Sequence, residues 1–435
     1  MQSSTIWLQN TESMVLKMRK MKASGIEWIG EIPEGWEITK LKYLATFPIE
    51  KNAHIDSPYI GLENIESWTG KYVSSDSQYD KSQALTFSRN NILFGKLRPY
   101  LAKVFFASND GCCSSEFCIL NFSSSVNIRY FWNLLVSPTF IDHVTKSTYG
   151  TKMPRANTDF IKNICVPVPP HIEQDRIALY LDATSAKIDS LISKTRSSIE
   201  EYKKLKQAVI TQAVTKGVRG EREMKDTGVE WIGEIPEEWN KCKLKNISID
   251  IGDGLHGTPK FDDSGEVYFI NGNNFSSEYV EPKFDTKKLC LEESLNYPKP
   301  ELTEQTIMIS LNGSYGKVCL YRYFPMLLGK SAGYITLLPS INRRYVRYYL
   351  SSTPAQIIMT LSLNGTTIPN LSLNTLYNFP TILPSASEQA EIADYLDAKC
   401  AEIDGLIAKK EQLAKELESY KKSLIYEVVT GKREV

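Results

Sequence analysis

Two long stretches of the chain carry apolar residues at the spacing of a long amphipathic helix. Both are free of proline, and Gly405 is the one glycine between Pro170 and Gly217 or between Pro384 and Gly431. Apolar residues recur at multiples of seven positions: Leu181, Ile188, Tyr202 and Val209, then Leu396, Ile403, Leu417 and Leu424. A second apolar line adjoins each: Leu191 and Leu205, then Leu406, Leu413 and Tyr420. The pattern predicts two helices of about 40 residues, each with an apolar seam.

The simplest way to bury the two apolar seams is to pack the two predicted helices against each other. Each would be roughly 60 Å long, which is too long for the flank of a small domain. We therefore expect an antiparallel intramolecular coiled coil with a globular domain at each end, related by a pseudo-twofold axis. Packing of each helix on its own domain is the alternative. Ser385 and Glu388 predict a capping box at the start of the second helix.

The rest of the chain has a mixed pattern. Short apolar runs at Ile92–Phe94, Phe117–Leu120 and Gly333–Leu338 predict strands. Aromatic-rich segments at Asn127–Val136 and Asn342–Leu350 predict helices. The expected fold class is therefore mixed α+β, with two globular domains separated by the long helices.

An internal repeat underlies this arrangement. Residues 21–36 return as 224–239 at an offset of 203, with both tryptophans kept. Residues 150–154 and 173–215 return at an offset of 215, whereas the segments between the shared ends have diverged. Shared ends around different middles indicate one scaffold that presents two recognition surfaces. Trp28, Trp36, Trp231 and Trp239 occur in both copies and are expected to form the fold.

The repeat predicts five parts of the chain. These are an N-terminal extension (1–23), a first globular domain (24–170), a first helix (171–222), a second globular domain (223–384) and a second helix (385–435). Because the repeat begins at a methionine, Met21 is an alternative start to Met1.

Composition adds few constraints. Lysine plus arginine equals aspartate plus glutamate, at 51 each, whereas a freestanding DNA-binding protein usually has a basic excess. A positive surface, if DNA is the ligand, must be local or supplied by a partner. The eight scattered cysteines and the lack of a long apolar run predict a cytoplasmic protein with reduced thiols.

Catalytic and metal-binding patterns are missing from the sequence. Gly329-Lys330-Ser331 ends like a phosphate-binding loop, but Phe324 stands where its first glycine is needed. The four histidines lack the paired spacing of a metal site or a catalytic triad. We expect no catalytic residues and no metal site in this chain.

The repeated motifs resemble the specificity subunits of type I restriction-modification systems. They are the Gly-Ile/Val-Glu-Trp-Ile-Gly-Glu-Ile-Pro-Glu-x-Trp segment, the Gln-x-x-Ile-Ala-x-Tyr-Leu-Asp-Ala segment and the closing Val428–Lys432. The first copy departs from the last motif, with Thr215-Lys216-Gly217 in place of Thr-Gly-Lys.

The resemblance implies a non-catalytic subunit that recognises double-stranded DNA. Each half would be a target recognition domain followed by a spacer helix, and the diverged halves would read an asymmetric bipartite target. Two methyltransferase subunits would bring S-adenosylmethionine, and two restriction subunits would bring the ATP- and Mg-dependent translocase and nuclease. A duplicated coiled-coil scaffold that binds proteins, and an enzyme with an unrecognised site, are the alternatives.

Candidate DNA-contacting residues lie on loops where donors and acceptors can reach base edges or phosphates. In the first half they are Lys96, Arg98, Tyr100 and Lys103 after the Ile92 strand, Lys152 and Arg155 beside Gly150, and Asn64. In the second half they are Asn312, Ser314, Tyr315, Lys317, Thr366, Thr367, Asn273 and Asn274. Glycine, asparagine and lysine on loops are also typical of turns and solvated surface, so this alternative stays open.

Overall fold

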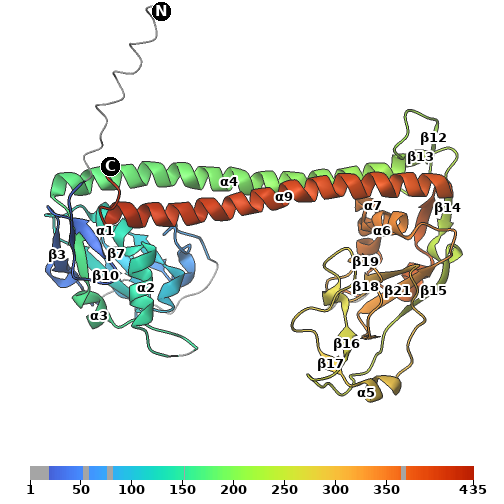
Figure 1. The fold of residues 1–435 in the computed structure, drawn as a ribbon, viewed down its shortest axis with the longest axis horizontal. Coiled ribbons are helices and arrows are strands. Elements are labelled where there is room, and N and C mark those ends of the chain that lie inside the picture. Colours follow the sequence, from blue (N-terminus) through green and yellow to red (C-terminus); the bar gives the residue numbers. More distant parts are fainter. Residues whose placement is uncertain (1–18, 52–57, 76–81, 151, 364–368) are drawn as a thin grey trace, which may run out of the picture. The chain divides into compact units, whose positions relative to one another are not determined.

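The computed structural model describes residues 19–51, 58–75, 82–150, 152–363 and 369–435 of the chain. The chain divides into two compact units. Unit 1 comprises Met1–Thr195 with Gln412–Val435, and unit 2 comprises Arg196–Glu411. Each unit therefore contains one globular part and a segment of each long helix (Figure 1).

Unit 1 is built on a four-stranded antiparallel sheet. Its strand order is β4 (Ala45–Thr46), β10 (Phe117–Phe122), β7 (Ile92–Gly95), β8 (Val104–Phe106). A second sheet has the order β5 (Tyr59–Ile60), β9 (Gly111–Cys113), β6 (Leu85–Phe87), with β5 and β9 parallel. Two further pairs are β1 (Met21–Ala23) with β2 (Glu31–Pro33), and β3 (Glu37–Lys40) with β11 (Cys165–Val168). The strands predicted in this half are confirmed as β7 and β10.

Aromatic side chains pack the short helices of unit 1 against its main sheet. These helices are α1 (Ile128–Leu135), α2 (Pro138–Lys146) and α3 (Thr158–Asn163). Phe94 of β7 meets Phe140 of α2 at 5.9 Å between ring centroids, and Phe122 of β10 stacks on Phe131 of α1 at 4.8 Å. The predicted helix after Asn127 is confirmed, because the Asn127 side chain accepts the backbone N–H of Tyr130 and caps α1.

Unit 2 repeats the strand order of the main sheet of unit 1. Its main sheet has the order β15 (Ser248–Asp253), β21 (Ala332–Leu337), β18 (Thr306–Ser310), β19 (Val318–Leu320). Its second sheet has the order β17 (Lys288–Leu289), β16 (Val267–Ile270), β20 (Met326–Leu328), with β16 and β20 parallel. The remaining pairs are β12 (Met224–Asp226) with β13 (Glu234–Pro236), and β14 (Asn240–Lys243) with β22 (Pro380–Leu383). The strand predicted at Gly333–Leu338 is confirmed as β21.

The two halves differ mainly at the second sheet. In unit 1 the third strand β6 pairs with β9, whereas in unit 2 the third strand β17 pairs with β16 at the opposite edge. The helices of unit 2 are α5 (Leu291–Leu295), α6 (Arg343–Ser351), α7 (Thr353–Leu361) and α8 (Leu373–Tyr377). The predicted helix after Asn342 is thus confirmed as α6, and the mixed α+β class is confirmed in both units.

Both predicted long helices are present. They are α4 (His171–Lys216) and α9 (Ala386–Val429). Each is followed closely by a glycine in the left-handed region, Gly217 at φ +78° and Gly431 at φ +71°. Such a residue ends a helix without the steric cost that a side chain would add. The first copy has Lys216-Gly217 where the second has Gly431-Lys432. Accordingly, α4 continues slightly further along the repeat than α9 before it reaches its glycine.

The second apolar line predicted along each helix was wrong by one position. Leu191 and Leu205 are about half exposed. Ile192 and Ile199, which lie on the heptad line one position further along the chain, are buried. On α9, Leu406, Leu413 and Tyr420 are likewise exposed, and the buried positions one residue further on include Ala414. In the first lines, Leu181, Ile188, Leu396, Ile403 and Leu424 are buried as predicted, whereas Tyr202, Val209 and Leu417 are half-buried. The helices therefore have a seam with alternating four- and three-residue steps and, beside it, an exposed apolar stripe.

Segments of α4 and α9 contact each other within each unit. In unit 1, Lys421 Nζ donates to Asp189 Oδ1 at 2.7 Å. In unit 2, Lys206 pairs with Asp404 at 2.6 Å, and the Lys410 ammonium lies 5.7 Å from the centroid of the Tyr202 ring. Residue numbers rise along α4 as they fall along α9, so the two segments in unit 2 are antiparallel.

A buried arginine–tryptophan–glutamate cluster joins the start of each half to the first turn of its long helix. In unit 1, Trp36 Nε1 donates to Glu173 Oε2 at 2.9 Å, and Arg19 pairs with the same carboxylate. Trp239, Arg222 and Glu388 form the same cluster in unit 2. Glu388 therefore makes half of the predicted capping box: its N–H donates to Ser385 Oγ at 3.3 Å, but its carboxylate faces Trp239 and Arg222.

Candidate nucleic-acid interface

Backbone hydrogen bonds bring the two candidate loops of unit 1 together. Arg98 N–H donates to Pro154 O at 2.7 Å, and Ala156 N–H donates to Lys96 O at 2.9 Å. Tyr149 and Arg155 exchange both of their backbone bonds, at 3.1 and 3.3 Å. The loop after β7 and the segment before α3 therefore form one surface.

The cationic side chains on this surface are used in different ways. Arg98 and Lys152 are exposed, and Tyr100 is 45% exposed. Arg155 pairs with Glu116, so its charge is balanced within the domain. Lys103 Nζ donates to Leu62 O at 2.7 Å, and burial lowers the pKa of this ammonium. Arg98, Tyr100 and Lys152 are thus the side chains most available to a ligand.

Unit 2 places its candidate loops in the same relation. Asn312 bridges to Asn370, and Leu371 N–H donates to Leu311 O at 2.9 Å. Ser314 and Lys317 are exposed on the loop between β18 and β19. Tyr315 is half-buried, and its hydroxyl donates to Thr360 Oγ1 at 3.4 Å. The candidates Thr366 and Thr367 lie outside the described residues.

The asparagine candidates divide into structural and exposed residues. Asn64 is buried: its amide accepts Gly61 N–H at 2.8 Å and donates to Val73 O at 3.2 Å. Asn274 is its buried counterpart, accepting Asn271 N–H and donating to Thr286 Oγ1. Because these amides are used inside the domains, we do not include Asn64 and Asn274 in the proposed DNA surface. Asn273 is exposed and stays a candidate.

The tryptophans shared by both copies are not equivalent in burial. Trp36 and Trp239 are fully buried, as expected of residues that form the fold. Trp28 stacks on His143 and meets Phe140 edge-on, each at 5.7 Å between centroids. Trp231 is 42% exposed. Sequence identity between the copies therefore does not by itself mark a core position.

Other chemistry adds little to this surface. Within the described ranges, histidine, cysteine, aspartate and glutamate nowhere gather in a group of three or more that could hold a metal ion. Burial raises the pKa of the Cys113, Cys118 and Cys319 thiols to about 12. In the same described part of the chain, no helix is both long and apolar enough to cross a membrane.

Comparison with known proteins defines the class. The model of the type I restriction modification DNA specificity domain matches the chain twice, over residues 33–201 and 236–418. These matches cover most of the chain, so it belongs to this family of DNA specificity proteins. It is a type I restriction-modification specificity subunit, and it is non-catalytic.

Individual relatives match nearly all or about half of the chain. The chain is 26% identical over 422 residues to the MjaVIII type I restriction enzyme specificity subunit of Methanocaldococcus jannaschii, covering 92% of this chain and 93% of that protein. It is 27% identical over 214 residues to the EcoDI specificity subunit of Escherichia coli, covering 47% and 45%.

Solved structures share the fold. A chain from a study of complex assembly and conformational transition of the type I R-M system has a TM-score of 0.74 at 19% identity, covering 92% of this chain and 99% of that one. The HsdS subunit of Thermoanaerobacter tengcongensis has a TM-score of 0.53 at 18% identity, covering 92% and 98%.

Two features escaped the sequence analysis. Arg19 takes the same part in unit 1 that Arg222 takes in unit 2, and the offset of 203 between them is that of the first repeat. Extending the alignment two residues upstream would have revealed it. Arg347 lines a cleft in unit 2, and its counterpart counted from the N-cap asparagine is Trp132.

Proposed function

We propose that this specificity subunit reads an asymmetric bipartite DNA target, one half-site per globular domain. The observation that carries the proposal is that two units with the same strand order in their main sheets present the same pair of loops with different side chains. Arg98, Tyr100 and Lys152 stand in one unit, and Asn312, Ser314 and Lys317 in the other. Because arginine suits guanine and asparagine suits adenine, different sets favour different base sequences.

The long helices would act as the spacer between the two half-sites. The buried seams of α4 and α9 and their antiparallel contacts in unit 2 support one intramolecular coiled coil with pseudo-twofold symmetry. A helix of 46 residues, as α4 is, spans roughly 70 Å. Such a spacer corresponds to about 20 base pairs, which suits two short half-sites separated by unread pairs.

The exposed apolar stripes on the helices would bind partner subunits. Leu191, Leu205, Leu406 and Leu413 are each exposed by about a third to a half of their surface. Exposed apolar side chains that recur along one line of a helix are consistent with a protein interface. The partners we propose are two methyltransferase subunits, which bring S-adenosylmethionine, and two restriction subunits, which bring ATP- and Mg-dependent translocation and cleavage.

The decisive experiment co-expresses the chain with its methyltransferase subunit and maps methylated adenines on genomic DNA. We expect one asymmetric motif of two short half-sites around a fixed gap. Exchanging residues 24–170 for those of another specificity subunit should change one half-site and leave the other unchanged. A stable complex that methylates no sequence would favour the alternative of a protein-binding scaffold.

A further inference from the structure

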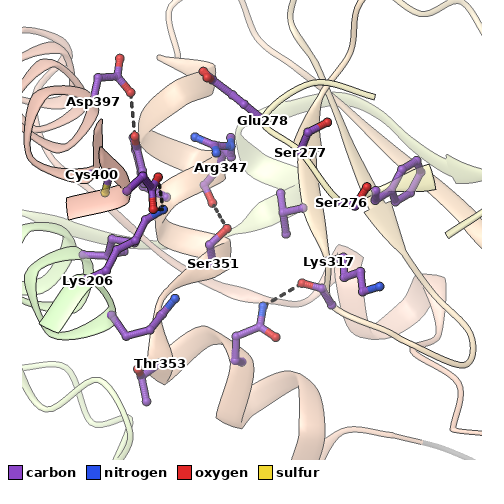
Figure 2. Close-up of a pocket in the computed structure, with 18 of the residues that line it drawn as sticks. Lys206, Ser276, Ser277, Glu278, Lys317, Arg347, Ser351, Thr353, Asp397 and Cys400 are labelled. Carbon is purple, nitrogen blue, oxygen red and sulfur yellow. Dashed lines mark hydrogen bonds and ion pairs between the residues drawn. The ribbon is translucent and has the colours of Figure 1, made fainter. Parts of the chain in front are cut away.

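A large cleft opens in unit 2 beside the candidate DNA loop. Its volume is about 1190 Å³, and its walls come from α4, α6, α7, α9, the segment after Gly272–Asn274 and the β18–β19 connection. Figure 2 shows Arg347 and Ser351 on one helix of this cleft, with Lys317 on a neighbouring wall. One wall is therefore part of the loop that carries Asn312, Ser314 and Lys317.

The cleft is lined by three cations (Lys206, Lys317 and Arg347) and three carboxylates (Glu278, Asp397 and Asp404), but they are not all paired with one another. Asp404 is paired with Lys206, and Asp397 accepts the Tyr348 hydroxyl at 2.7 Å and pairs with Arg344. Among the described residues, neither the Arg347 guanidinium nor the Lys317 ammonium has an ion-pair partner. Glu278 is exposed on the loop opposite.

Arg347 also has an unmet need for an acceptor. Its Nε is buried, and no group in the described part of the chain accepts a hydrogen bond from it. A buried donor without a partner costs roughly 1–3 kcal/mol. Its guanidinium lies 4.9 Å from the centroid of the Tyr348 ring, which limits its orientations. A guanidinium held against an aromatic ring in this way is a less flexible donor than a lysine ammonium.

The first half of the chain fills the corresponding place with tryptophan. Trp132 is five residues after the N-cap of α1, as Arg347 is after that of α6, and its Nε1 donates to Val104 O at 3.0 Å. Trp68 stands four residues after Asn64, as Glu278 does after Asn274, and Lys422 of α9 lies 4.1 Å from the centroid of its ring. The two halves therefore place different side chains at these positions: Trp68 and Trp132 in unit 1, and Glu278 and Arg347 in unit 2.

We propose that this cleft binds a DNA backbone phosphate through Arg347 and Lys317, at the edge of the second half-site. Guanidinium groups match phosphate with paired hydrogen bonds, and the Ser276 hydroxyl in the lining is a neutral donor typical of phosphate contacts. The Ser277 and Ser351 hydroxyls already donate to Tyr279 O and Arg347 O. The cleft adjoins the proposed base-reading loop, so a strand contacted by that loop would continue into it. This inference rests on the proposed function.

The test measures DNA binding by the full chain in complex with its methyltransferase subunit. Arg347→Gln is compared with the wild type on the duplex defined by methylation mapping and on a scrambled duplex, over a range of salt concentrations. We expect about a tenfold loss of affinity on both duplexes and a salt slope that is smaller by about one. Arg347→Lys should restore the slope, because the charge returns.

The control is Arg322→Gln, which removes an exposed arginine of the same unit outside the cleft. It should leave affinity and slope unchanged. Thermal unfolding and the recovered amount of complex verify that each variant folds.

Three results would overturn the phosphate site. The first is an Arg347→Gln variant with unchanged affinity and slope. The second is a changed half-site with an unchanged slope, which would make Arg347 a base-reading residue. The third is loss of the methyltransferase complex, which would make the cleft a protein interface. A wild type that neither binds nor methylates DNA would overturn the proposed function itself.

Discussion

Replacing Glu388 should release the start of α9 from the globular part of unit 2. Glu388 is almost completely buried, and its carboxylate accepts Trp239 Nε1–H at 2.9 Å and Arg222 Nη2–H at 2.5 Å. The Arg222 guanidinium also lies 5.3 Å from the centroid of the Trp239 ring. In Glu388→Ala, the indole N–H loses its acceptor in a poorly solvated place, and the guanidinium loses one of its acceptors.

The expected cost follows from this geometry. Removing one partner of a buried, hydrogen-bonded ion pair costs about 3–5 kcal/mol. Arg222 keeps a second pair with the partly exposed Glu238, at 2.9 Å, so we expect the lower end, about 3 kcal/mol. For a unit of this length, that corresponds to a fall in Tm of roughly 6–12 °C.

The assay combines thermal unfolding with hydrogen exchange read by mass spectrometry. Faster exchange should appear in residues 234–239 and in the first turns of α9, because these segments are joined by the cluster. Glu391→Gln is the matched control on the same helix, since its pair with Arg219 is exposed and should contribute nothing measurable. Equal effects of Glu388→Ala and Glu391→Gln would refute the reasoning.

Three further predictions test the loops, the helix register and the thiols. Arg98→Ala with Lys152→Ala should weaken DNA binding by the complex tenfold or more without lowering the Tm; unchanged affinity in a gel-shift titration would remove these residues from the DNA surface. Ile192→Ala should destabilise unit 1 by about 2–4 kcal/mol in chemical denaturation, whereas Leu191→Ala should cost little stability; equal costs would contradict the register. Burial raises the pKa of Cys113, Cys118 and Cys319 to about 12, so their thiolate fraction at pH 8 is very small; iodoacetamide followed by peptide mapping should spare them in the folded protein, and rapid labelling would show that these sites open.

Sequence periodicity predicted where the long helices lie better than it predicted which of their residues are buried. The stretches between Pro170 and Gly217 and between Pro384 and Gly431 contain α4 and α9, and the first apolar lines are buried or half-buried, because one heptad line is enough to locate a helix. The prediction of the second lines was wrong because it chose the more hydrophobic residues. Leucine is more hydrophobic than threonine or alanine, yet Thr195 and Ala414 are buried at the seam and Leu191 is exposed. Burial of small or polar residues is decided by the facing helix, which one sequence pattern does not contain.

The candidate loops show the same limit. Spacing after the Ile92 strand located a loop, but not that Arg98 and Pro154 are joined by a hydrogen bond. Asn64 and Asn274 looked like base-reading residues because an amide suits adenine; in the fold, that same pair of donor and acceptor closes a turn. The sequence cannot distinguish an asparagine that reads a base from one that closes a turn, since both require an amide at the end of a strand.

The repeated cluster explains how the two halves could diverge without losing the fold. Trp36 with Glu173 and Trp239 with Glu388 tie the entrance of each domain to its helix, and Tyr130 and Tyr345 donate to Pro167 O and Ile382 O inside the adjoining cores. None of these atoms belongs to the loops after β7 or β18. Substitutions there leave the shared contacts intact, so Trp132 in one half can be Arg347 in the other. The side chains of these loops can therefore differ between the two halves without loss of the shared contacts.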